Sequence, residues 1–511
     1  MAIKISKILD SQQNWKSKAK QRQSKIATLK KAAQRKKRRV AKDARDREAF
    51  DRITKENEEL RAMLANNRPS NVSPSNVSLE CIPPIRSRGL CVLLVLAGVV
   101  SFRSVPRILM LFQPALCFPV TISHFTSVIH WILRAGVAVF KHVAPLAERW
   151  VALIDCSIDI GARKTLVVLR VPLSVLQKKG RAIGLQDCEC VGMEISSSWD
   201  GESIRAALTR IFSVAGAPAA ILKDQGSDLK KGVKLWNQRA TANPIPVIED
   251  VGHFAANILK SMFMKSPLFF KFLKIVSEGS ARIRQTALAW LLPPKLRIKG
   301  RFQGITQIAD WAQNVLKKLD PTNPAGCVDA DKVHKAFPGL KRLTPFLNHF
   351  CQVCSITEDF LKLLKTKGLN ETTYQQAKEL VAKPSTPPVL QTRLSNWLET
   401  HIQIFRELDI PDLSLLVSSD PIESLFGKFK TMVQRNPRSE LNRLLYIIPL
   451  LCGNHSQITI EQALQQCSHS EMLAAIKRTV PETLRQQREK KLGSCQIAVP
   501  KTGGSPPENS K

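Results

Sequence analysis

The sequence predicts an α/β fold: a mixed five-stranded sheet with flanking helices, interrupted by a large all-α insertion and preceded by basic, helical N-terminal regions. Three observations predict it. Residues 150–173 are rich in β-branched residues on both sides of a short turn, which is typical of a β-hairpin. Residues 188–263 then alternate short apolar runs with amphipathic stretches, which is typical of strands followed by helices. Residues 265–412 have a helical pattern, which predicts the insertion.

The chain is strongly basic. Its 511 residues carry 77 Lys and Arg against 42 Asp and Glu, which gives a net charge of +35 and a pI near 10.0. A surplus of this size favours a polyanionic partner. We expect double-stranded DNA first and a membrane surface second. The apolar run at residues 90–100 is shorter than the roughly 20 residues that cross a bilayer, so we expect a buried helix there and no membrane partner.

The twelve cysteines form no regular disulfide framework, and no secretory signal precedes them, which predicts reduced thiols in an intracellular protein. Cys351 and Cys354 form a C-x-x-C pair, and Cys188 and Cys190 form a C-x-C pair. Neither has a second ligand pair at zinc-finger spacing, so structural zinc is not expected.

A basic arm is predicted over residues 1–65. Within it, residues 16–42 contain thirteen Lys or Arg and no Asp or Glu, and their composition favours a helix. Ile53, Leu60 and Leu64 then follow a heptad-like pattern, which favours a short coiled coil that could pair two copies. A solvated, partly disordered basic tail is the alternative.

A Pro-, Ser- and Asn-rich linker is predicted over residues 66–88, and a helix-turn-helix region over residues 89–145. The second region has the order helix, short helix, turn and longer helix, which is typical of that DNA-binding unit. We expect the longer helix to face a DNA groove with Arg134, beside Thr126, Ser127 and His130. A helical scaffold that touches no bases is the alternative.

Three antiparallel strands followed by alternating helices and strands is the order of an RNase H-like fold. Its strands are expected at residues 151–160, 165–173, 188–195, 218–224 and 245–250. Its helices are expected at residues 202–216, 227–238 and 251–263. The predicted domains are the core at 146–264, the insertion at 265–415, a core-closing helix at 416–450, C-terminal helices at 451–491 and a disordered tail at 492–511.

Three acidic residues have distinctive surroundings: Asp155 in VALIDCSIDI, Asp224 in PAAILKDQG and Glu423 in DPIESLFGK. The first two lie at the ends of β-prone runs, and the third opens a helix. Carboxylates held in this way suit a pair of divalent metal ions for phosphodiester chemistry, because cations offset their mutual repulsion. We expect two Mg²⁺ ions, for which Mn²⁺ can substitute.

Two neighbouring aspartates compete for these roles. Asp159 shares a face with Asp155 if the strand alternates regularly, but Asp155 is nearer the middle of the strand and is favoured. Asp228 starts a helix four residues after Asp224, where a capping role is the better interpretation.

These blocks resemble the DDE transposases of bacterial insertion sequences. The resemblance is carried by D-x-S-I-x-x-G-x-x-K-x-L-V-V-L-R-V at Asp155, D-Q-G-S-D-L-K-K-G at Asp224 and D-P-I-E-S-L-F-G-K-F-K at Glu423, within about residues 100 to 450. It implies catalysis by these three acids, with cleavage at element ends and attack of the freed 3′-hydroxyl on target DNA. It also implies a homodimer or larger assembly on DNA, in bacterial cytoplasm at the nucleoid.

The resemblance implies further site residues. Asp250 and His253 match a Cys/Asp-x-x-His element of several such enzymes and are expected near the site; capping or packing by His253 is the alternative. The 199 residues from Asp224 to Glu423 require the insertion, which in some transposases holds flipped or hairpinned DNA. Stacking or, more commonly, core packing is expected for the insertion residues Trp290, Trp311 and Trp397. Phosphate contacts or a solvated face are expected for Lys295, Arg297, Lys299, Arg301, Lys428 and Lys430.

Two other functions are compatible with the sequence. The chain could be a non-catalytic DNA-binding regulator or transposase remnant, although it keeps all three acids. It could also be an RNase H-fold nuclease or resolvase, which the long insertion disfavours.

Overall fold

The computed structural model describes residues 87–116, 124–160, 163–179, 183–240, 244–295, 302, 304–319, 330–410, 412–433, 442–480 and 486. The predicted basic arm, coiled coil and most of the linker lie outside the described residues, as does the C-terminal tail.

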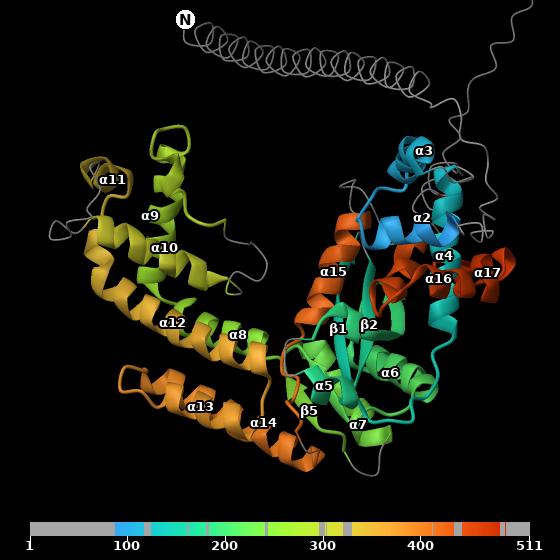
Figure 1. Ribbon diagram of the computed structural model, residues 1–511. Coiled ribbons are helices and arrows are strands. Elements are labelled where there is room, and N and C mark those ends of the chain that lie inside the picture. The colour runs from blue at the N-terminus through green and yellow to red at the C-terminus, as the bar shows by residue number, and fades with distance from the viewer. Residues whose placement is uncertain are drawn as a thin grey trace, which may run out of the picture. The chain divides into compact units, whose positions relative to one another are not determined.

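A five-stranded mixed sheet contains all the named strands of the described residues (Figure 1). Its order is β3-β2-β1-β4-β5. The first three strands are antiparallel neighbours, and β4 and β5 run parallel to β1. This arrangement fits the RNase H-like order predicted from the sequence. The strands are β1 Trp150–Ile160, β2 Arg163–Pro172, β3 Glu189–Ser196, β4 Ala220–Lys223 and β5 Val247–Glu249.

Both faces of the sheet are covered, which explains why its central strands are almost wholly apolar. Helices α6 (Gly201–Ala215) and α7 (Ser227–Ala240) pack together on one face, where Trp150 and Ile154 of β1 meet Phe212 and Trp236. The alternate β1 residues, such as Leu153, belong to the second and larger cluster of the core, which also contains residues of α4, α8 and α15.

Three helices precede the sheet, close to the predicted positions: α2 Ser87–Leu96, α3 Ser104–Leu116 and α4 Phe125–Lys141. The first ends four residues before the predicted end of the apolar run. Helix α4 lies so close to the C-terminal segment that a Cβ added at Gly136 would be 1.8 Å from the carbonyl oxygen of Tyr446. Only glycine fits at this crossing.

Most of the described segment between β5 and the third acid is helical, whereas residues 412–419 before α15 are not. Its helices are α8 Val251–Phe263, α9 Pro267–Ile283, α10 Ile305–Lys318, α11 Ala330–Ala336, α12 Thr344–Lys367, α13 Glu371–Val381 and α14 Pro388–Leu408, with short 3₁₀ turns at Ala289–Leu291 and Lys341–Leu343. The long helix α12 packs against α8, α10 and α13, and α14 packs against β5 (Figure 1). Helix α15 (Asp420–Val433) then returns to β1.

Two elements differ from the prediction because of proline. The second strand ends at Pro172, one residue before its predicted end, and Leu173–Lys179 form helix α5, which was not predicted from the sequence. Within the predicted core-closing region at 416–450 and at the start of the predicted C-terminal helices, Arg443–Leu451 form a 3₁₀ helix, η4, which contains Pro449. Proline lacks the N–H that an α-helix needs. The remaining elements are the 3₁₀ turn η1 Leu185–Asp187 and helices α16 Gln457–Gln466 and α17 His469–Thr479.

Within the described part of the chain, no helix combines the length and the apolar character required to cross a membrane. The cysteines described there are all free thiols. Cys351 and Cys354 are buried in α12, where burial raises their pKa values.

Candidate active site at the ends of β1 and β4

The first two predicted acids lie at the same edge of the sheet. Strands β1 and β4 are parallel neighbours, and their register pairs Ile154 with Lys223. Asp155 and Asp224 are the next residues of these two strands in the chain. Because the carboxyl ends of parallel neighbours meet at one edge, the two acids lie beside each other, as predicted.

A β-bulge lies between Asp155 and Asp159. Asp155 pairs with Val167 and Ile158 pairs with Thr165, so β1 has one extra residue between these pairs. The extra residue breaks the regular alternation of the strand. The regular alternation that the sequence predicted between positions 155 and 159 is therefore interrupted, and the assignment of Asp155 as the first acid stays a prediction.

Asp155 is a buried carboxylate, with 6% of its surface exposed. Its Oδ1 accepts a hydrogen bond of 2.6 Å from the backbone N–H of Cys156. Burial first, and then the charges of Asp224 and Glu423, raise the pKa of Asp155 to about 7, against the opposing effects of that hydrogen bond and His253. The charge of the carboxylate is therefore poorly compensated by the protein itself.

Asp224 lies in a loop that side chains hold in place. Its Oδ1 accepts a hydrogen bond of 3.0 Å from the backbone N–H of Gly226. The next residue, Gln225, donates to Glu249 at 2.8 Å and accepts from Asn257 of α8 at 2.5 Å. Asp228 is exposed in the first turn of α7, which agrees with the role expected for it at a helix start.

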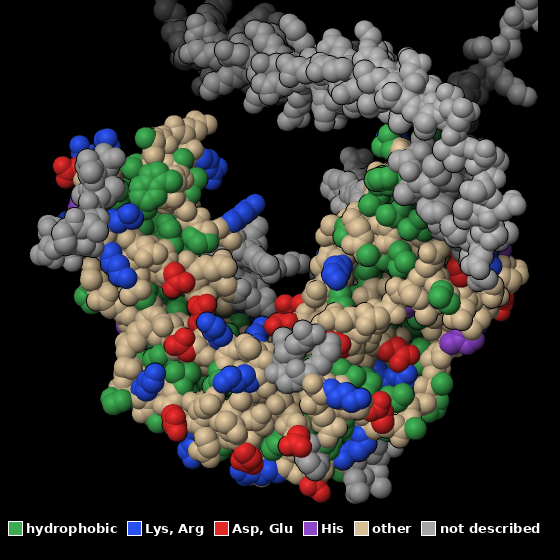
Figure 2. Space-filling view, in the orientation of Figure 1, with side chains coloured by type: hydrophobic (Ala, Val, Ile, Leu, Met, Phe, Trp, Pro, Cys, Tyr) green, Lys and Arg blue, Asp and Glu red, His purple; other side chains and the backbone are tan. Residues whose placement is uncertain are grey.

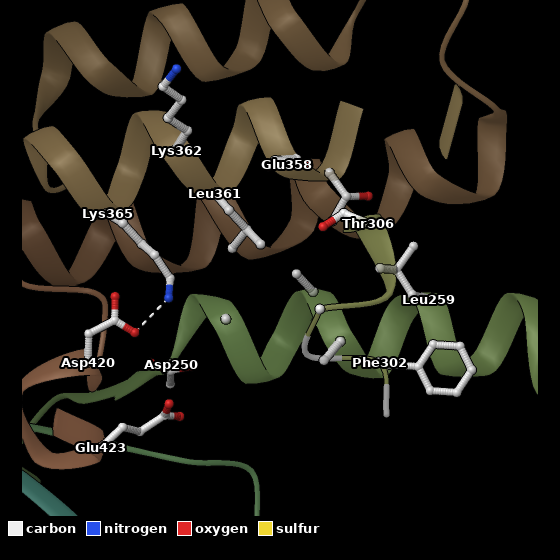
Figure 3. A pocket seen from close by; sticks show the side chains of 15 residues that line it. Asp250, Leu259, Phe302, Thr306, Glu358, Leu361, Lys362, Lys365, Asp420 and Glu423 are labelled. Atoms are coloured by element: carbon white, nitrogen blue, oxygen red, sulfur yellow. Dashed lines mark hydrogen bonds and ion pairs between the residues drawn. The ribbon is translucent and has the colours of Figure 1, made fainter. Parts of the chain in front are cut away.

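Glu423 lies in the first turn of α15 and points toward α8 (Figure 3). Its Oε1 lies 3.0 Å from Nε2 of His253, which is on the first turn of α8. This hydrogen bond, followed by the charges of Asp250, Asp224 and Glu423, raises the pKa of His253 to about 9 despite partial burial. The predicted Asp-x-x-His element therefore contacts the third acid directly.

Asp155, Asp224 and Glu423 supply the hard oxygen ligands that Mg²⁺ prefers. Their arrangement is not that of a formed metal centre, because no group of three His, Cys, Asp or Glu side chains within the described ranges is placed to hold an ion. Each acid has an oxygen engaged by an N–H group of the protein. The chemistry of the residues fits a divalent cation, whereas their side chains are arranged for hydrogen bonding.

A pocket of about 390 Å³ lies beside Glu423, between the start of α15 and helices α8 and α12 (Figure 3). Leu259, Leu361 and Phe302 give it apolar walls. Lys365 of α12 crosses it and bonds to Asp420 at a distance of 2.6 Å. Sequence reasoning missed this pair because Lys365 and Asp420 belong to separate helices, and Asp420 was considered only as the first residue of the block around Glu423.

The predicted DNA-contact residues have different surroundings. Lys428 is exposed and Lys430 is half-buried on α15, and Lys295 is exposed after the 3₁₀ turn that contains Trp290. Arg297, Lys299 and Arg301 lie outside the described residues. On the face that Figure 2 shows, Lys and Arg side chains are scattered among Asp and Glu.

Arg134 has a structural role that the sequence did not indicate. Its Nε donates to the carbonyl oxygen of Cys467 at 2.8 Å and its NH2 group to that of Leu464 at 2.6 Å. The guanidinium thus holds the end of α16 against α4. His130, on the same helix, has its ring 5.2 Å from that of His469, so α16 and α17 cover part of the surface predicted to face DNA.

The three tryptophans of the insertion also differ in their surroundings. Trp397 is buried and stacks on His401. Trp311 is partly buried, packs against the core and donates to the carbonyl oxygen of Leu291. Trp290 is 60% exposed, with the ammonium of Lys318 4.9 Å from its ring centre.

Models of known protein families give no match to this chain, and neither do the sequences of characterised proteins. Among solved structures, the chain is similar to the Drosophila P element transposase strand transfer complex. The likeness is distant, with 11% sequence identity and a TM-score of 0.39 over 78% of this chain and 97% of the other.

Proposed function

We propose that this chain is a DDE transposase of an insertion sequence, which cuts DNA at the ends of its element and joins them to target DNA. The observation that supports this most is the proximity of three acids from distant parts of the chain. Asp155 and Asp224 come from neighbouring strand ends, and Glu423 is close enough to raise the pKa of Asp155.

Asp155, Asp224 and Glu423 would hold two Mg²⁺ ions, and Mn²⁺ could replace them. Such ions stabilise the attacking and leaving oxygens of an in-line displacement at phosphorus. The protein's own residues orient the acids: Gly226 and Cys156 donate to Asp224 and Asp155, and His253 holds Glu423.

The basic charge of the chain supports a DNA partner, because a net charge of +35 favours a polyanion. Lys428 and Lys430 follow Glu423 on the same helix and would contact the DNA backbone there. The proposed transposase would act as a dimer or a larger assembly, since two element ends must be joined to one target.

Cleavage of the DNA that flanks the coding region tests the proposal. We expect the purified protein to nick this DNA with Mg²⁺ or Mn²⁺ and to produce joined strands. Asp224→Ala should abolish both products, whereas Asp228→Ala, four residues away on the exposed start of α7, should retain them.

The reaction products distinguish a transposase from the two alternative functions. Cleavage without joining, under conditions in which both DNA ends are bound, would identify a nuclease or resolvase. DNA binding with no cleavage by the wild type would identify a non-catalytic regulator, and equal activity of Asp224→Ala would remove the assignment of the acids.

A further inference from the structure

The carboxylate of Asp250 connects two helices that are far apart in the sequence. It is buried, with 2% of its surface exposed. Its Oδ1 accepts from the backbone N–H of His253 at 2.6 Å, at the start of α8. Its Oδ2 accepts from the backbone N–H of Ser419 at 2.6 Å and from the Ser419 hydroxyl at 2.9 Å, just before α15.

The main chain around Asp250 is attached to the same edge of the sheet as the first two acids. The backbone N–H of Asp250 donates to the carbonyl oxygen of Lys223 at 3.0 Å, one residue before Asp224. Val251 donates in the same way to Val417 at 2.9 Å. The backbone of Asp250 is therefore fixed relative to β4. Its carboxylate in turn fixes the start of α15 relative to the same strand.

Ser419 connects directly to the third acid. Its carbonyl oxygen accepts from the backbone N–H of Ile422 at 3.0 Å and from that of Glu423 at 3.2 Å, so it starts the first turn of α15. A short path of hydrogen bonds thus leads from the end of β4 through Asp250 and Ser419 to Glu423.

A comparison within the chain separates this arrangement from ordinary helix capping. Asp200 caps α6 and, like Asp250, accepts from a serine: Oδ1 bonds to the backbone N–H of Ser203 at 2.8 Å and to its hydroxyl at 2.7 Å. Both bonds stay within one helix start. Asp250 also caps its own helix, but its second oxygen holds a residue 169 positions away.

We propose that Asp250 and Ser419 are positioning residues that set the place of Glu423 relative to Asp155 and Asp224. The inference rests on the proposed function, in which Glu423 is the third metal-holding acid. Neither residue touches the DNA or the metal in this proposal; both act through the first turn of α15. Residues that orient ligands in this way commonly change metal affinity by about 10–100-fold when they are replaced.

We call the hydrogen-bonded pair of Asp250 and Ser419 the clasp. Two measurements test its effect on Glu423. The first is Mn²⁺ affinity, measured by electron paramagnetic resonance on the full chain. Asp250→Asn should weaken binding by about 10–100-fold. Ser419→Ala should weaken it less, because the backbone N–H of Ser419 remains, and Ser419→Thr should restore it, because the hydroxyl returns. Asp200→Asn is the matched control, which should bind Mn²⁺ as the wild type does.

The second measurement needs no metal. In the presence of EDTA, the ring resonances of His253 report its contact with Glu423. Ser419→Ala should move them toward their positions in Glu423→Gln, and Ser419→Thr should not.

The outcomes are distinct. If folded Ser419→Ala matches the wild type in both Mn²⁺ affinity and the His253 resonances, the clasp is overturned while the proposed function stands. If the wild type binds no Mn²⁺, or if Asp155→Ala binds it equally well, the proposed function fails. In that case the His253 resonances still decide whether Ser419 sets the position of Glu423. If Asp250→Asn does not fold, the two Ser419 variants decide the question alone.

Discussion

Replacing Asp155 by Asn should stabilise the protein in the absence of divalent metal. Burial and neighbouring acids raise the pKa of Asp155 from its ordinary value of 3.8 to about 7. Since the folded pKa is the higher one, this group favours folding most below pH 3.8, and stability is lost as the pH rises toward 7. At roughly 1.4 kcal/mol per pKa unit, the charged form costs about 4 kcal/mol at pH 8.

Asparagine removes this cost and keeps the local geometry, because its side-chain oxygen can still accept from the backbone N–H of Cys156. Urea unfolding in EDTA should therefore give Asp155→Asn an advantage of about 4 kcal/mol at pH 8 and of about 2 kcal/mol at pH 5. Cleavage of DNA should be lost in the same variant. Added Mn²⁺ should stabilise the wild type and leave the variant unchanged.

Asp228→Asn, at an exposed carboxylate, serves as the control and should show no such gain. An Asp155→Asn protein no more stable than the wild type at pH 8, or a gain that does not grow with pH, would refute the reasoning about a buried, poorly compensated charge.

Four further substitutions test the fold and the DNA contacts. His401 is buried, its ring accepts from the backbone N–H of Glu249, and burial lowers its pKa from 6.5 to about 4. The wild type should lose about 3 kcal/mol of stability relative to His401→Leu as the pH falls from 6.5 to 4 in urea titrations. Gly136→Ala should lower the unfolding free energy by at least about 1–3 kcal/mol, because the added methyl would overlap the carbonyl oxygen of Tyr446. Arg134→Ala should reduce thermal stability without changing the salt dependence of DNA binding, because its guanidinium is engaged with α16; Lys428→Ala should reduce the slope of that dependence by about 1.

Local patterns were sufficient to predict most of the sheet and the acids on it. The run VALI before Asp155 is apolar because both faces of β1 are covered, and the short strand before Asp224 is apolar for the same reason. The sequence could not show the bulge after Asp155, because the register depends on the partner strand.

Contacts between distant residues were the main features that the sequence did not reveal. The signal for Asp250 was its place in the Asp-x-x-His element, three residues before His253, and this spacing accounts for only one of its oxygens. Its bond to Ser419 depends on the return of the chain after the whole helical segment. The bonds of Arg134 were missed for a similar reason, since the helix that it holds lies more than 300 residues further along.

The hydrogen bonds of Val251 with Val417 and of Asp250 with Ser419 bear on the evolution of such a chain by insertion and deletion. These bonds join the two ends of the helical segment between β5 and α15 at one edge of the sheet. Lengthening a segment whose ends already meet adds little entropic cost, about 0.6 kcal/mol for each doubling of a flexible loop. Segments of very different size could therefore be acquired or lost between these two anchor points while the spacing of the acids stays the same.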